Sequence, residues 1–294
     1  MYYYRIADLT LAVDGDWPQL GIGRMKEYRI GQTSDESLPD VHYHIRQECM
    51  EIDMPDMADC VEVNKRLWMH TKDGGYAMVD RVPEFSEKII NCIRANSDWS
   101  EVCGELCRED FCGVDKNMRA FQVVGETFPY VLMQHNGMVL HSSCILYQGQ
   151  AVLFSAPSGT GKSTHTRLWK QYYPETVIFN DDLPAIRMKK DKSGQVTPIA
   201  YGTPWCGKTQ TNENISAPIR AIVFLKQAAQ NEIRRVNGAE AAFLLMQGIR
   251  KHVLPDMMQK SLDNASELVS LVPTYELSCN ISREAVETVK NILF

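Results

Sequence analysis

"LFSAPSGTGKSTHTRLW", residues 153–169, is the stretch that decides how the second half of this 294-residue chain folds. It joins an apolar run to a glycine-rich turn, a lysine, two hydroxyl residues and an amphipathic segment. Backbone N–H groups at a helix N-terminus, a lysine and a hydroxyl are the groups that together bind phosphates and their magnesium. The stretch therefore predicts a phosphate-binding loop between a strand ending at Ser155 and a helix beginning near Ser163.

Each residue type in the loop has a chemical reason to be there. Gly159 and Gly161 permit a tight backbone path, Lys162 supplies the cation for the outer phosphates, and Ser163 supplies a hydroxyl for magnesium. Ala156 departs from the general pattern, which has a glycine at that position. The competing interpretation is a structural glycine-rich turn that happens to precede a lysine. The predicted nucleotide contacts are Ser158, Gly159, Thr160, Gly161, Lys162, Ser163 and Thr164.

Two aspartates follow the next apolar strand, in "VIFNDDL", residues 177–183. A nucleotide-binding loop needs a second magnesium contact, which is normally an aspartate at the end of such a strand. The other carboxylate could accept the proton of an acceptor hydroxyl. We expect Asp181 to transfer the proton and Asp182 to bind magnesium. In the alternative interpretation, one of the pair only caps a turn before Pro184.

Composition excludes several classes of function. The net charge is −6, with both signs mixed along the chain, which does not favour binding to nucleic acid or to an anionic membrane. We find no export signal and no run of about 20 apolar residues, so we expect a soluble, cytoplasmic protein without nucleic-acid or membrane partners. The sequence leaves a homo-oligomer open.

The nine cysteines are predicted to be reduced thiols, because their number is odd and no export signal precedes them. Cys103, Cys107 and Cys112 are the one close group. Three thiolates could begin a metal site, but paired Cys-x-x-Cys knuckles and a nearby histidine are missing. We favour the interpretation that Cys103 and Cys107, at helical spacing, are small apolar residues on one buried helix face.

The pattern of elements predicts an α/β (mixed α+β) protein with two domains. Residues 1–120 are expected to form a smaller α/β domain that recognises the acceptor; they include a helix over 85–96 and no catalytic constellation. Residues 121–294 are expected to form the nucleotide-binding catalytic domain, with hairpin-rich mixed sheets rather than regular βαβ alternation. In this half, Asn237 and Glu240 predict a capping box, and Ser282 predicts the cap of the C-terminal helix.

"SGTGKST", the preceding hairpin with His141 in its first strand, and "NDD" resemble the catalytic domain of the HPr kinase/phosphorylase family. The similarity covers residues 130–190 and does not extend to residues 1–120. It implies the nucleotide-binding fold shared with phosphoenolpyruvate carboxykinases. It also assigns Gly159 to Ser163 to the phosphates, Asp181 and Asp182 to proton transfer and magnesium, and His141 to a position beside the phosphate. A satisfied polar residue at a strand start is the other interpretation of His141.

The resemblance implies a magnesium-dependent kinase that transfers the γ-phosphoryl group of ATP or GTP to a hydroxyl of a protein, a peptide or a small molecule. Alternatives are a carboxykinase-type enzyme and a nucleotide-gated peptide-binding module without turnover. "YGTPWCGKTQTNEN", residues 201–214, differs from the family's glycine-rich acceptor signature, so the acceptor stays open. In this segment Lys208 is either a phosphate contact or a solvated loop lysine.

Overall fold

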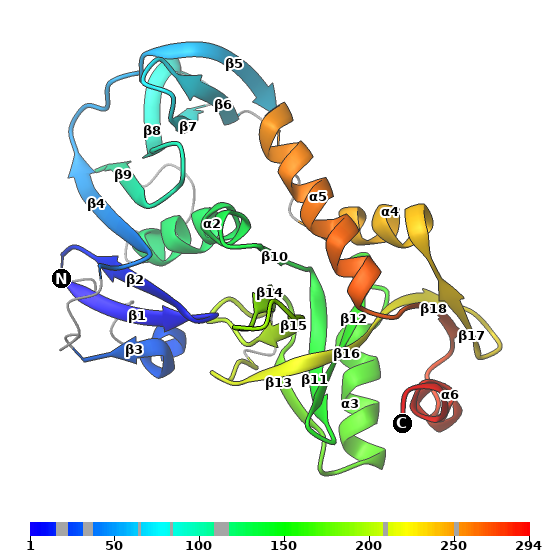
Figure 1. Cartoon of the computed structure of the whole chain (residues 1–294). Helices are drawn as coiled ribbons and strands as arrows, with labels where there is room; N and C mark the ends of the chain where they lie inside the picture. The colour runs from blue at the N-terminus through cyan, green and yellow to red at the C-terminus, as the bar shows by residue number, and fades with distance from the viewer. Residues whose placement is uncertain are drawn as a thin grey trace. The chain divides into compact units, whose positions relative to one another are not determined.

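The computed structural model describes residues 1–15, 23–31, 38–63, 66–82, 85–108, 118–207, 211–249 and 253–294. It divides into two compact units (Figure 1). The first unit comprises Met1–Gln134 and His252–Met258, and the second comprises His135–Lys251 and Gln259–Phe294. Each unit is a mixed α/β structure built on a large sheet. The functions assigned to residues 1–120 and 121–294 stay predictions.

The first unit is a nine-stranded sheet in the order β3-β1-β2-β4-β9-β8-β7-β6-β5. Its strands are β1 (Tyr2–Ile6), β2 (Leu9–Val13), β3 (Arg29–Ile30), β4 (Val41–Cys49), β5 (Met57–Val63), β6 (Arg66–Thr71), β7 (Tyr76–Val82), β8 (Phe85–Ala95) and β9 (Glu101–Cys107). The 3-10 helix η1 spans Gly23–Tyr28. Neighbouring strands are antiparallel, except that β4 is parallel to both β2 and β9.

Helix α2 (Arg119–Gln134) covers one face of this sheet. Tyr43 of β4 is fully buried, and its hydroxyl accepts a hydrogen bond from Thr127 in α2 at 3.2 Å. Tyr130 of α2 stacks on Trp99 with ring centroids 4.7 Å apart. Because successive strand residues point to opposite faces, the neighbours of Tyr43 in β4 point away from α2. That other face carries polar side chains, among them His42 and His44.

Two predictions for the first half are wrong. Residues 85–95 form strand β8 instead of a helix, and their pairing with β7 and β9 explains the difference. Cys103 and Cys107 do not share a helix face: both lie in β9, where Cys103 is exposed and Cys107 is buried. Residues 66–82 form an antiparallel hairpin of β6 and β7. Cys112 lies outside the described residues.

The second unit contains a mixed sheet in the order β10-β14-β15-β16-β12-β11-β13, and β18 pairs with both β16 and β17. Its strands are β10 (Gly137–Val139), β11 (Ser142–Tyr147), β12 (Gln150–Ser155), β13 (Val177–Asn180), β14 (Ala185–Lys190), β15 (Val196–Tyr201), β16 (Ser216–Gln227), β17 (Glu232–Val236) and β18 (Thr274–Cys279). β16 is parallel to β12 and to β18. The predicted hairpin-rich, mixed arrangement is confirmed.

Helices cover both faces of this sheet. The alternation along β12 explains the two cores, because Val152 and Phe154 face one side and Leu153 faces the other. The first side packs against α3 (Lys162–Tyr172) and α6 (Arg283–Leu293), through side chains such as Trp169. The second side packs against α4 (Gly238–Gly248) and α5 (Pro255–Leu271).

The predicted helix caps have different outcomes. Ser282 caps α6 by accepting a hydrogen bond from the backbone N–H of Ala285, as expected. The prediction of a capping box at α4 is wrong, since the side chain of Asn237 makes no capping hydrogen bond. Glu240 instead forms an ion pair with Arg234 at 2.6 Å, a stronger partner than a backbone amide.

Candidate phosphate-binding site

The glycine-rich loop joins the buried strand β12 to helix α3, as the sequence predicts. Gly159 has a φ of +81° and Gly161 a φ of +117°, in the region that favours glycine. Gly161 is also the N-cap of α3, and no side chain caps this helix end. The first backbone N–H groups of α3, with the positive end of the helix dipole, are therefore open to an anion.

Lys162 is held at the first position of α3 with its side chain turned inward. The residue is only 7% exposed, and its Nζ donates to the carbonyl oxygen of Ala156 at 2.9 Å. Nζ also lies 3.0 Å from Nε2 of His141. Burial lowers the pKa of Lys162, and the nearby charge of Asp182 opposes this effect in part. The amine is thus placed in a poorly solvated position, where a charged contact to phosphate is strong.

His141 connects the lysine to the aspartate pair. It lies between β10 and β11, where its backbone N–H donates to the carbonyl oxygen of Gly248 and its own carbonyl accepts from Ser155. Its Nε2 lies 3.2 Å from Oδ1 of Asp182 and 3.0 Å from Nζ of Lys162. The structure therefore brings together Lys162, His141 and Asp182, three of the predicted site residues.

Asp181 and Asp182 occupy a turn that is fixed by Asn180, the last residue of β13. The side-chain oxygen of Asn180 accepts the backbone N–H groups of Asp182 and Leu183, and its amide donates to Thr203. Asp181 is 5% exposed, and its Oδ1 accepts the N–H of Gly207 at 2.8 Å. The side chain of Asp182 is 34% exposed. The two carboxylates thus have different environments, although they are adjacent in the chain.

Gly207 lies close to both carboxylates. A Cβ added to Gly207 would lie 3.4 Å from Oδ2 of Asp181 and 3.4 Å from Cβ of Asp182. The 201–207 segment therefore packs its backbone directly against the aspartate pair. Lys208, the tentative phosphate contact that follows, lies outside the described residues.

Two clefts flank the loop within the second unit. One, of about 290 Å³, is lined by residues that include His141, Ala156, Gln247 and Glu276. The other, of about 440 Å³, contains the loop backbone from Gly159 to Gly161 together with β16 and the end of β18. Both clefts are of the size that ligand pockets occupy. The loop thus has space for a bound molecule on each side.

Sequence reasoning missed the residues that hold the site in place. Asn180 stands in the "NDD" motif, but its role depends on bonds to Thr203, which lies 23 residues away. Gln227, at the end of β16, donates to the carbonyl oxygen of Thr160 at 3.1 Å and so fixes the loop from another strand. The asparagine directly before the paired aspartates was the one local sequence signal for these contacts. No residue near the loop in the sequence indicates the contact from Gln227.

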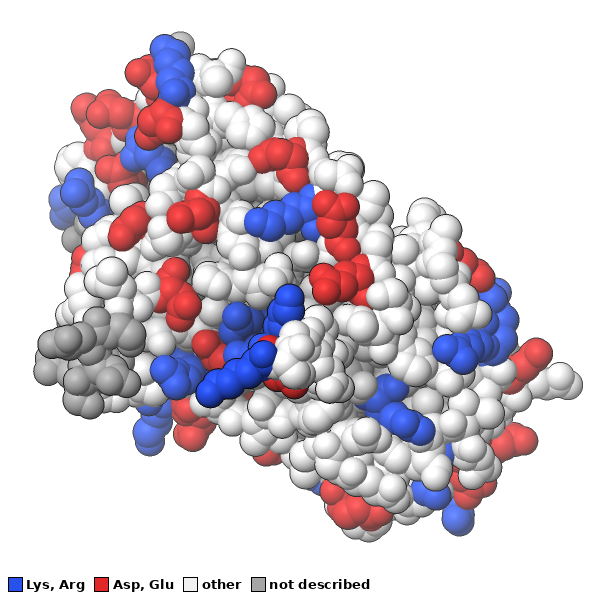
Figure 2. All heavy atoms as spheres, viewed as in Figure 1, with Lys and Arg blue, Asp and Glu red and all other residues white. Residues whose placement is uncertain are grey.

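The surface shows no broad field of one sign on the face drawn in Figure 2, where lysine and arginine are interspersed with aspartate and glutamate. Within the described residues, no helix combines the length and the apolar character needed to cross a membrane.

Comparison with known proteins gives a family match and matches among solved structures. The family model described as "SynChlorMet cassette protein ScmC" matches residues 106–294, more than half of the chain. No curated protein matches the chain. Among solved structures, the Hpr(Ser) kinase/phosphatase from Coxiella burnetii matches with 10% identity and a TM-score of 0.29, over 53% of this chain and 95% of that chain. With so low a TM-score, this match carries no inference about function.

Proposed function

The chain belongs to the ScmC family, whose match includes the phosphate loop and the paired aspartates, and we propose that it is a magnesium-dependent kinase. It would transfer the γ-phosphoryl group of ATP or GTP to a hydroxyl of a protein, a peptide or a small molecule. The catalytic unit would then have the fold of the HPr kinase/phosphorylase family, which phosphoenolpyruvate carboxykinases share. The observation that carries the proposal is the buried Lys162 amine, 3.0 Å from His141 at an uncapped helix start.

The loop fits a nucleotide's phosphates in three respects. Gly159 and Gly161 adopt positive φ, and no atom lies within 4 Å of a Cβ built on either residue. The backbone is therefore open to close approach by a ligand. The N–H groups at the start of α3 would donate to phosphate oxygens, and Lys162 would neutralise the β- and γ-phosphates. Ser158, Thr160 and Thr164 complete the predicted set of contacts.

Ser163 and Asp182 would hold the magnesium ion. A hydroxyl and a carboxylate are oxygen ligands, which Mg²⁺ prefers, and Asp182 is the more exposed of the two aspartates. Bound magnesium would neutralise charge on the phosphates. His141 would then orient Asp182 while it contacts Lys162, so the lysine and the carboxylate keep a fixed separation.

Asp181 would serve as the base for the acceptor hydroxyl. The acceptor oxygen bonds to the γ-phosphorus, the bond from that phosphorus to the β–γ bridging oxygen breaks, and the hydroxyl proton passes to Asp181. The N–H of Gly207 donates to one carboxylate oxygen at 2.8 Å and so orients the side chain of Asp181. Most of the rate enhancement would come from positioning and charge neutralisation.

The test is transfer of label from ATP radiolabelled in its γ-phosphate. The full chain, Mg²⁺ and a cell extract are incubated, and the labelled product is identified by mass spectrometry. We expect a product labelled on a hydroxyl with the wild type and loss of labelling with Asp181→Asn. Glu175→Gln, an acidic residue before β13, is the matched control that should keep full activity. No transfer by the wild type, or undiminished transfer by Asp181→Asn, would overturn the proposal.

A further inference from the structure

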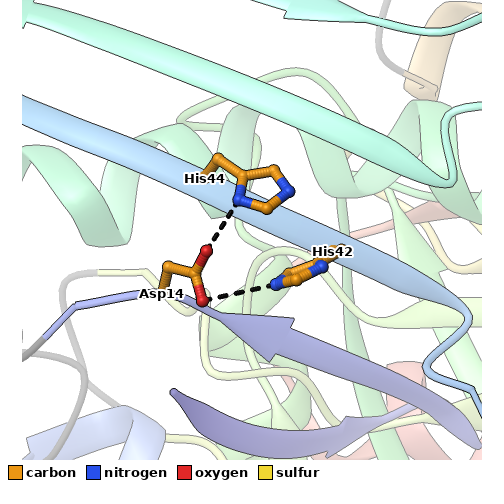
Figure 3. A group of neighbouring side chains, drawn as sticks. All are labelled: Asp14, His42 and His44. Atoms are coloured by element: carbon orange, nitrogen blue, oxygen red, sulfur yellow. Dashed lines mark hydrogen bonds and ion pairs between the residues drawn. The ribbon is translucent and has the colours of Figure 1, made fainter.

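The polar face of the first unit's sheet brings two histidines and an aspartate together. His42 and His44 lie two residues apart in β4, so both point to the face opposite the buried Tyr43. Asp14 follows β2 directly, and its backbone N–H donates to the carbonyl oxygen of Tyr43 at 2.9 Å. In Figure 3 both imidazole rings point toward the carboxylate of Asp14. Parallel pairing of β2 with β4 therefore creates the group.

The distances are those of side chains that share one centre. Nδ1 of His44 lies 2.6 Å from Oδ2 of Asp14, and Nε2 of His42 lies 3.4 Å from Oδ1 of Asp14. One candidate ligand atom from each residue can be chosen so that all three lie within 4.8 Å of one another. Ligands of a tetrahedral zinc ion, with bonds near 2.0–2.1 Å, are separated by about 3.3 Å. An ion at the centre would replace the direct contacts of the two histidines with Asp14.

A fourth residue supports the orientation of His44. Its Nε2 lies 2.9 Å from Oε2 of Glu101 in β9. Histidines that bind a metal commonly donate their other ring N–H to a carboxylate, which fixes the tautomer. With Nε2–H donated to Glu101, the lone pair of Nδ1 in His44 is directed at the shared centre. Glu101 thus has the position of a carboxylate that hydrogen-bonds to a metal-binding histidine.

The charge of Asp14 also fits a cation. An aspartate carboxylate beside two imidazoles supplies one negative charge to the group. Asp14, His44 and Glu101 line a cavity of about 620 Å³, larger than either cleft beside the phosphate loop. An ion held here would have coordination positions facing open space.

We propose that Asp14, His42 and His44 bind one divalent transition-metal ion of the Zn²⁺ class, with Glu101 hydrogen-bonded to His44. Two imidazoles with one carboxylate suit zinc and similar ions, whereas Mg²⁺ and Ca²⁺ favour all-oxygen sites. Three protein ligands leave at least one position for water or a substrate, as in zinc sites that take part in chemistry. The site is independent of the proposed kinase activity.

The test is equilibrium binding of Zn²⁺ to the full chain after treatment with a chelator, together with the visible spectrum of the Co²⁺ form. We expect one tight Zn²⁺ per chain. Glu101→Gln should weaken binding by about 10–100-fold, the usual cost of losing an outer partner. Asp14→Asn and His44→Gln should weaken it further. Circular dichroism will show whether each variant is folded. If a variant of a metal ligand does not fold, Glu101→Gln still tests the proposal.

Three control variants separate this site from other binding. His70→Gln changes a histidine of the same unit that has its own carboxylate partner, Asp59. His141→Gln changes the phosphate site, and Cys103→Ser removes a thiol that lines the same cavity. All three should bind Zn²⁺ as the wild type does. No stoichiometric binding by the wild type, unchanged binding in Asp14→Asn and Glu101→Gln, or a thiolate-to-cobalt charge-transfer band would overturn the proposal.

Discussion

At the residue scale, the second unit places two neighbouring carboxylates in different environments. Asp181 is nearly inaccessible and is held by the N–H of Gly207, whereas Asp182 is partly exposed and contacts His141. The difference arises because Asn180 fixes the turn through two backbone N–H groups and contacts to Thr203. Adjacent residues can therefore have separate roles, which substitution can resolve.

We expect the two aspartates to differ in their dependence on magnesium. Asp182→Asn should raise the Mg²⁺ concentration needed for half-maximal activity, because a metal ligand is lost. Asp181→Asn should leave nucleotide affinity nearly unchanged and reduce the rate by about 10²–10⁴-fold, the range for a lost general acid or base. The measurement is a Mg²⁺ titration of phosphoryl transfer for both variants. Equal shifts in Mg²⁺ requirement would refute the division of roles.

Residue-scale prediction from sequence was possible where the chemistry is local. Lys162, Ser163 and the two glycines lie within a few positions of one another, so one window of sequence reveals the loop. The group of Asp14, His42 and His44 was missed, because 28 residues separate Asp14 from His42. The alternation of two histidines in a strand was the available signal. It indicates a shared face but not the carboxylate that a neighbouring strand brings to it.

At the element scale, helix α3 follows the glycine-rich loop and contains a neutral, buried histidine. Burial lowers the pKa of His165 from 6.5 to about 4. Its Nε2 accepts a hydrogen bond from Nε1 of Trp169 at 3.2 Å, and its ring packs edge-on against Phe154 in β12. The uncharged imidazole thus contributes to the contact between α3 and the sheet.

This histidine predicts a loss of stability in mild acid. Between pH 6.5 and about 4 the unfolded chain binds a proton at His165 that the folded chain does not, so the free energy of unfolding falls as the pH falls. From pH 7 to pH 5 this group should account for about 2 kcal/mol. We expect His165→Gln, which keeps an acceptor for Trp169, to flatten that part of the pH profile in urea unfolding.

The matched control is His70→Gln, where the sign is opposite. Burial acts to lower the pKa of His70, but hydrogen bonds to Asp59 and Asp256 outweigh it and raise the pKa above its usual value. Its contribution to stability is therefore present in acid and lost as the pH rises. His70→Gln should steepen the loss of stability on acidification rather than reduce it. A profile that His165→Gln leaves unchanged would contradict the account of α3.

Element prediction from sequence failed mainly where distant pairing decides the structure. Residues 85–95 contain apolar residues at positions that suit a helix, including Ile89 and Ile93. Pairing with β7 on one side and β9 on the other makes them a central strand of the first unit. No helix was predicted from the sequence over the residues of α5. The strands around the glycine-rich loop were recognised because their apolar runs are short, continuous and bounded by turns.

At the scale of the whole molecule, the groups that would bind the phosphates all lie in the second unit. Lys162, His141, Asp181 and Asp182 belong to it, and so do both clefts beside the loop. The first unit contains its own cavity and the histidine–aspartate group. The two units thus offer separate sites within one chain.

Hydrogen exchange of the full chain with and without MgATP should reflect this separation. We expect added protection in segments 153–169 and 177–183, since the ligand would cover the backbone N–H groups of the loop and order the aspartate turn. Strands β4 and β9 of the first unit should exchange at unchanged rates. Protection concentrated in these strands, without change in 153–169, would place the nucleotide elsewhere.

The central claim is that the loop before α3 binds the phosphates of a nucleotide through Lys162. Calorimetric titration of MgATP into the full chain tests it most directly, with Lys162→Ala as the test variant and Lys170→Ala, an exposed lysine of the same helix, as its control. We predict one site per chain in the wild type and in Lys170→Ala, and an affinity at least about 10-fold weaker in Lys162→Ala, from the loss of a charge-assisted contact. Equal affinity of Lys162→Ala and the wild type, or no binding by the wild type, would contradict the account.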